Sequence, residues 1–214
     1  MGTYNNGITG SFNGRVGPVV GVMWKGKSVV RARPKKRTAP LTPNERRHRA
    51  KFALVNNFLR GAISLVNYSF HSELLHQSGY NKAFSYNIKN AVVLKENKPF
   101  IDYSMSLLSK GDLPKPESFV ADTSESGKII FTWKDNSGRG QALSSDLAFV
   151  ALYSEEKNIW LGEEKVAERS EGKYEFNLPA EYGDLEFQIY FGFVSANEKE
   201  SCDSVYAGAI VFKK

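Results

Sequence analysis

The sequence predicts an α+β protein in which a Gly-rich N-terminal β-ribbon and a two-helix segment precede an immunoglobulin- or fibronectin-like β-sandwich. Short β-branched stretches punctuated by glycine fill residues 4–33. Apolar residues recur at helical spacing after a helix-start signal at 41–45. About seven short strands with turn signals between them fill the last ~100 residues. The expected parts are a ribbon with a basic linker at 1–40, a helical segment with one strand at 41–112 and the sandwich at 113–214.

The N-terminal ribbon is too rich in glycine to form a helix. Its six glycines separate short apolar runs, a spacing typical of brief strands and tight turns. We expect a hairpin with its turn at 25–27. Because an isolated hairpin is only marginally stable in water, the ribbon is expected to lie on its own domain, on a neighbouring subunit or on nucleic acid.

A helix is expected from residue 42 to about residue 68. Thr42 is suited to the N-cap, Pro43 to the first helical position, and Glu45 completes a capping box. Apolar residues at three- and four-residue spacing then form one face of this helix. The remaining elements expected before the sandwich are a second helix over 79–93 and a strand over 100–108.

The C-terminal part has the pattern of an all-β module. Apolar and other residues alternate over 186–194, which predicts a strand with one buried face. Trp133 stands on an early strand, as in immunoglobulin-like sandwiches. The expected strands are 117–121, 128–133, 147–153, 158–161, 173–177, 186–194 and 204–212.

Charge is divided unevenly along the chain. Residues 1–60 carry thirteen basic side chains and one acid, a net charge of +12. Since the whole chain carries +6, the remainder carries −6. Parts of opposite sign indicate either a polyanionic partner for the basic part or head-to-tail contact between the two parts.

The dense basic stretch predicts a non-enzymatic binding or structural protein that engages nucleic acid or another polyanion. No helix-turn-helix, zinc-finger or RNA-recognition signature is present, so binding would be to the phosphate backbone without sequence specificity. Trp24 is expected to stack on a base or to anchor the ribbon. The residues expected to bind the polyanion are Lys25, Lys27, Arg31, Arg33, Lys35, Lys36, Arg37, Arg46, Arg47 and Arg49.

A second hypothesis makes the ribbon an assembly arm. In this alternative the protein is a self-assembling structural component, virion- or filament-like, whose ribbon adds a strand to a neighbour's sheet. Either hypothesis predicts a homo-oligomer or a larger assembly. Burial of the basic residues against another chain would favour assembly, whereas a cluster on one open face would favour polyanion binding.

The sequence offers no recognisable catalytic machinery, so an enzyme of unrecognised type is the remaining alternative. Residues 21–28 read G-x-x-x-x-G-K-S, but the residues after Ser28 favour a strand, whereas a phosphate-binding loop needs a helix there. His71 and His76 are five residues apart, a poor spacing for two ligands on one helical face. The acidic pairs 155–156 and 163–164 flank a short strand and are expected at hairpin ends. We therefore expect no cofactor, no metal and no catalytic residue.

The compartment predicted from the sequence is the cytoplasm. The first nine residues lack the features of a signal peptide, and no apolar run approaches the ~20 residues of a membrane span. Cys202 is the single cysteine, which excludes a disulfide framework within the chain and a multi-cysteine metal site.

Four stretches carry a recognisable signature: GITGSFNGRVG at 7–17, WKG at 24–26 followed by RARP at 31–34, FTWKDNSG at 131–138 and DSVYAG at 203–208. Together they resemble an uncharacterised bacterial family, a domain of unknown function. The resemblance covers nearly the whole chain and implies that both halves belong to a single unit. It implies no activity, cofactor or catalytic residue.

Overall fold

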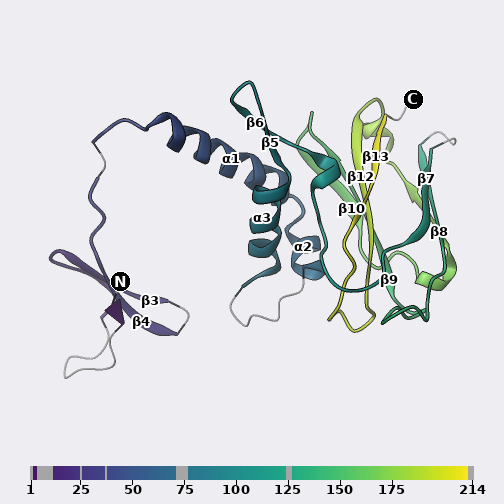
Figure 1. The fold of residues 1–214 in the computed structure, drawn as a ribbon, viewed down its shortest axis with the longest axis horizontal. Coiled ribbons are helices and arrows are strands. Elements are labelled where there is room, and N and C mark those ends of the chain that lie inside the picture. Colours follow the sequence, from purple (N-terminus) through teal and green to yellow (C-terminus); the bar gives the residue numbers. More distant parts are fainter. Residues whose placement is uncertain are drawn as a thin grey trace. The chain divides into compact units, whose positions relative to one another are not determined.

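The chain divides into two compact units, Met1–Thr42 and Pro43–Lys214. The computed structural model describes residues 2–3, 12–24, 26–36, 38–70, 77–123 and 127–211 (Figure 1). The boundary follows an extended segment that contains Pro34 and Pro40. Prolines disfavour both helix and strand pairing, so this segment separates the two units.

The first unit is a small antiparallel sheet with the strand order β1-β4-β3-β2. The expected hairpin is present: Trp24 pairs with Lys27, and Gly26 adopts a φ of 76°, which glycine tolerates best. Within the described part of this unit only Gly21 and Val29 are buried, so the sheet has almost no core. Its strands are β1 (Gly2–Thr3), β2 (Gly14–Val16), β3 (Val19–Trp24) and β4 (Lys27–Ala32).

The helix expected over 42–68 is broken in two at Gly61 and Ala62. Gly61 lies against the indole of Trp160, where an added Cβ would stand 2.5 Å from Cδ1. A larger residue therefore fits at this break only if the indole moves. The helices are α1 (Pro43–Arg60), α2 (Ile63–Ser69) and α3 (Gly79–Asn90).

The segment after α3 forms a hairpin. The sequence instead predicts a helix that continues to residue 93 and a strand over 100–108. Val92 and Val93 are β-branched and favour strand over helix. Glu96 and Asn97 have φ values of 48° and 65°, as in the type I′ turns that join two-residue hairpins. The elements here are β5 (Val92–Lys95), β6 (Lys98–Ile101) and a 3₁₀ turn at Tyr103–Met105.

The seven strands expected in the C-terminal part are all present and form two sheets, with the orders β10-β9-β12-β13 and β11-β8-β7 (Figure 1). This arrangement confirms the predicted α+β fold with an immunoglobulin- or fibronectin-like sandwich. Trp133 lies on β8, the second strand of the sandwich, and is buried in the core between the sheets. The strands are β7 (Glu117–Asp122), β8 (Lys128–Lys134), β9 (Leu147–Ser154), β10 (Ile159–Glu163), β11 (Lys173–Asn177), β12 (Glu186–Val194) and β13 (Val205–Val211).

The prediction of a half-buried strand over 186–194 is wrong, because β12 is buried on both faces. Phe187 and Ile189 face the core between the sheets. Tyr190 and Val194 face a second core on the opposite side of the sheet. The hydroxyl of Tyr190 has a hydrogen-bond partner in this second core, since it lies 2.6 Å from Oγ of Ser106.

The second core joins the helices to the outer face of the four-stranded sheet. The ring of Phe58 on α1 packs edge-on against Tyr153 at 5.1 Å between centroids and lies 5.2 Å from Trp160. Val55, Leu59 and further side chains of α1–α3 complete this core. The helical segment and the sandwich thus share buried surface and form one unit (Figure 1).

A buried arginine anchors one end of the sandwich. Arg169 has no exposed side-chain surface, and its Nε donates to Oδ2 of Asp146 at 3.1 Å. One terminal nitrogen of Arg169 donates to Oδ1 of Asn136 at 2.6 Å, and the guanidinium lies 3.9 Å from the ring centroid of Phe193. The indole of Trp133 donates to the carbonyl of Arg169 at 2.8 Å. Two of the residues that hold this arginine, Trp133 and Asn136, therefore lie in the stretch 131–138.

Replacing Asp146 by alanine is expected to destabilise the protein by about 3–5 kcal/mol, because it leaves the guanidinium of Arg169 buried without its counter-ion. Urea unfolding followed by circular dichroism measures the loss. The control is Arg139→Ala, which removes an ion pair with Glu117. The side chain of Arg139 is largely exposed, so this change should alter stability very little. Equal losses in the two variants would contradict the role assigned to Asp146.

The buried tyrosines predict loss of stability at alkaline pH. Burial, with a smaller contribution from Glu155, raises the pKa of Tyr153 to about 12, and burial raises the pKa of Tyr190 as well. Both phenols bind their protons more tightly in the folded state than in the unfolded state. Their contribution to the free energy of unfolding is therefore complete below about pH 10 and declines as the pH rises further.

The free energy of unfolding should therefore fall between pH 10 and 12 by up to ~1.4 kcal/mol per pH unit for each such tyrosine. Chemical denaturation at a series of pH values measures this slope. Tyr190→Phe removes one titrating group and should make the slope shallower. A free energy of unfolding that stays constant from pH 10 to 12 would refute the prediction.

Candidate nucleic-acid interface

One face of the N-terminal sheet carries cations and an aromatic ring together. Trp24 is paired with Lys27, and Val20 lies between Arg15 and Arg31 on the two neighbouring strands. Directly paired residues share a face and side chains alternate along a strand, so all five residues lie on the same side of the sheet. Arg15, Lys27 and Arg31 are exposed, and Trp24 exposes 57% of its surface.

The cationic surface continues into the segment after β4. Arg33, Lys35 and Lys36 are exposed in this extended stretch. The backbone N–H of Arg33 donates to the carbonyl of Pro18 at 2.8 Å, which ties the start of the segment to the sheet. The predicted residues Lys25 and Arg37 lie outside the described residues.

The helical cations Arg46, Arg47 and Arg49 belong to the second unit. They lie in the first two turns of α1, and the buried residues of this helix begin only at Val55. Arg46 and Arg49 are exposed, whereas Arg47 is half-buried and donates to Oδ1 of Asn44 at 3.3 Å. The sequence-predicted cations thus fall into two groups, one on each unit.

The charged side chains of the first unit are all basic. Residues 1–42 contain eight basic side chains and no acid, whereas all 23 acidic residues belong to 43–214. No carboxylate within the unit offsets the cations on its sheet face. The surface therefore has a positive potential suited to phosphate groups.

The sequence 21–28 that mimics a phosphate-binding loop lies in an antiparallel hairpin. Lys27 and Ser28 begin strand β4 and pair with Trp24 and Met23. A phosphate-binding loop places its lysine and serine at the start of a helix, where backbone N–H groups surround the phosphate. The hairpin lacks that arrangement.

Other candidate chemistry is sparse in the described residues. No group of three His, Cys, Asp or Glu side chains among them could hold a metal ion, and His71 and His76 lie outside them. Cys202 is buried, and burial raises the pKa of its thiol to about 11, so the thiol stays protonated at neutral pH. None of the helices in these residues is long and apolar enough to cross a membrane.

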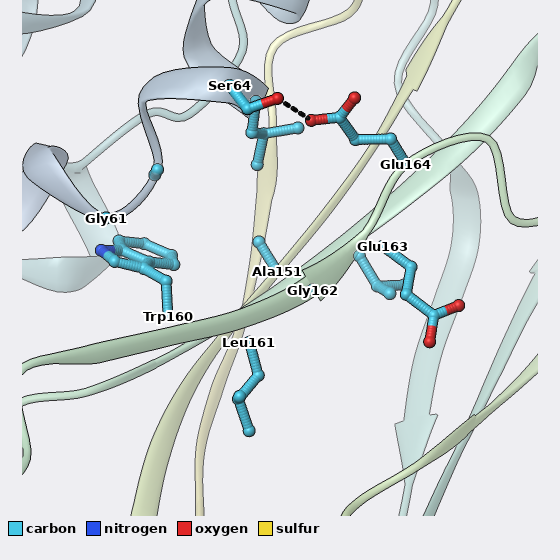
Figure 2. Close-up of a pocket in the computed structure, with 11 residues that line it drawn as sticks. Gly61, Ser64, Ala151, Trp160, Leu161, Gly162, Glu163 and Glu164 are labelled. Atoms are coloured by element: carbon cyan, nitrogen blue, oxygen red, sulfur yellow. Dashed lines mark hydrogen bonds between the residues drawn. The ribbon is translucent and has the colours of Figure 1, made fainter.

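The structure contains a pocket that the sequence analysis did not predict, between the junction of α1 with α2 and strand β10 (Figure 2). The hydroxyl of Ser64 donates to Oε1 of Glu164 at 3.0 Å at its mouth, and the indole of Trp160 lines it (Figure 2). Ser64 and Glu164 stand 100 positions apart in the sequence. No local spacing signals such a pair.

These features define a class of protein: a sandwich module with a helical layer on one sheet, linked to a small basic sheet that presents cations and a tryptophan on one face. The family of unknown function DUF6266 matches residues 11–208, and the chain belongs to this family.

The chain is also similar to individual solved structures. No curated protein matches the sequence. The solution structure of the fn3 domain of human collagen alpha-1(XX) chain aligns with 47% of this chain and 85% of that chain, at 9% sequence identity and a TM-score of 0.33.

Proposed function

We propose that this protein is a non-enzymatic binding protein whose N-terminal unit engages the phosphate backbone of nucleic acid without sequence specificity. The observation that carries the proposal is the shared face of Trp24, Lys27 and Arg31. Cations on this face neutralise phosphates, and an indole beside them stacks on an unpaired base. This combination favours a single strand over a duplex, because stacking needs a base with an accessible face.

The spacing of the cations supports contact with several phosphates. Lys27 and Arg31 lie four residues apart on one strand, about 13 Å at the rise of an antiparallel strand. Arg33, Lys35 and Lys36 add further exposed cations in the segment after β4. The helical cations Arg46 and Arg49 would add phosphate contacts of the same sequence-independent kind.

The test is fluorescence anisotropy with a labelled single-stranded oligonucleotide, titrated at several salt concentrations. Changing Lys27, Arg31 and Lys35 together to glutamine should lower the slope of log K against log salt by about 2, since each lost phosphate contact removes ~0.7. The control is the double change Lys157→Gln and Lys199→Gln, which removes exposed cations from the second unit and should leave the slope nearly unchanged.

A further variant separates stacking from charge. Trp24→Ala should weaken binding to the single strand by about 1–3 kcal/mol and leave the salt slope unchanged. If the wild-type protein fails to bind at low salt, or if the control pair weakens binding as much as the triple variant, the proposed function is wrong.

The second candidate function is self-assembly, and the opposite face of the same sheet favours it. Val16 and Met23 expose 57% and 53% of their surfaces there. They lie on the other side from Trp24, because Val16 pairs with Val19 and Met23 alternates with Trp24 along β3. Exposed apolar side chains on a sheet with almost no core indicate a contact with protein.

In this candidate function the wild-type protein, freed of nucleic acid with nuclease and high salt, is an oligomer by size-exclusion chromatography with light scattering. Changing Val16 to threonine and Met23 to glutamine should convert it to a monomer, because both side chains are exposed in the isolated chain. Trp24→Ala, on the other face, should leave the oligomer intact. A monomeric wild-type protein would exclude the assembly function.

A further inference from the structure

The pocket beside β10 combines an apolar interior with a charged mouth. Its volume is about 350 Å³. Leu65 and Ala151 are buried side chains that line it, and the indole of Trp160 forms one side (Figure 2). The indole is held in place, since its Nε1 donates to the carbonyl of Phe58 at 2.6 Å.

The charge at the mouth of the pocket is negative and not neutralised within the described residues. Glu164 accepts a hydrogen bond from the neutral hydroxyl of Ser64. Glu163 turns away from Ser64 in Figure 2 and accepts from the hydroxyl of Tyr174. The neighbouring cation, Lys165, is paired with Glu198. Neither pocket carboxylate therefore has a cationic partner in the part of the chain that the structure describes.

We infer that this pocket binds the side chain of a lysine or arginine presented by another protein chain. Such side chains carry a methylene stem that packs on apolar surface and a cationic head that remains near a carboxylate. The stem would lie against Leu65 and Ala151, and the head would meet Glu164 at the mouth. The face of an indole also attracts cations.

Charge and shape together exclude the other simple occupants. An anion would meet the carboxylate of Glu164, and a neutral apolar side chain would leave that carboxylate without a cation. The inference is independent of nucleic-acid binding, because every residue that it uses lies in the second unit, away from the basic sheet in sequence.

The test is a titration of the full-length, ¹⁵N-labelled protein followed by NMR through the indole N–H resonance of Trp160. The probes are Nα-acetyl-lysine amide and Nα-acetyl-arginine amide, whose side chains keep their charge. The matched neutral probe is Nα-acetyl-norleucine amide. We expect both cationic probes to shift the resonance saturably in the millimolar range. Norleucine, which has the stem without the charge, should bind at least fivefold more weakly.

Two variants test whether the carboxylate of Glu164 binds the cationic head of the probe. Glu164→Gln preserves shape and should weaken the cationic probes on the order of fivefold, as expected for one partly exposed ion pair. Glu156→Gln, an exposed carboxylate beyond the other end of β10, should change nothing. The inference is overturned if norleucine binds as well as lysine, if Glu164→Gln binds both cationic probes like the wild type, or if no probe shifts the Trp160 resonance.

Discussion

Burial of β9 and β12 on both faces is the constraint from which the rest of the second unit follows. Phe149, Ala151 and Tyr153 of β9 alternate with residues that face the other sheet, so neither side of this strand meets water. A two-sheet sandwich covers only one face of its central strands. The helices α1–α3 cover the second face. Removing this helical segment from the sandwich would therefore expose an apolar surface.

A network of buried polar groups fixes the geometry at one end of this layered unit. Arg169 is fully buried, yet it is met by Asp146, Asn136 and the ring of Phe193. Asn136 in turn donates to the carbonyl of Lys115, which joins the segment before β7 to the loop after β8. Residues 131–138 thus supply two of the groups, Trp133 and Asn136, that hold the sandwich together at Arg169.

The first unit, in contrast, has almost no hydrophobic core of its own in its described part. A sheet with two buried residues in its described part cannot derive much stability from its own interior. The strand register places Trp24, Lys27 and Arg31 on one face, together with Val20 and Val29, and Val16 and Met23 on the other face. Two-residue periodicity turns a short sequence into two surfaces of different chemistry. These surfaces support the proposed nucleic-acid contact and the alternative assembly contact respectively.

The sequence by itself determined the elements that depend on local pattern. The turn at Gly26, the seven strands of the sandwich and the basic character of 1–60 all follow from neighbours in the chain. The candidate residues Lys27 and Arg31 could be named from charge, but their common face with Trp24 required the strand register. The break at Gly61, the second buried face of β12 and the pocket of Ser64, Trp160 and Glu164 were decided by tertiary structure alone. Each depends on residues about 100 positions apart, and local periodicity holds no information about such contacts.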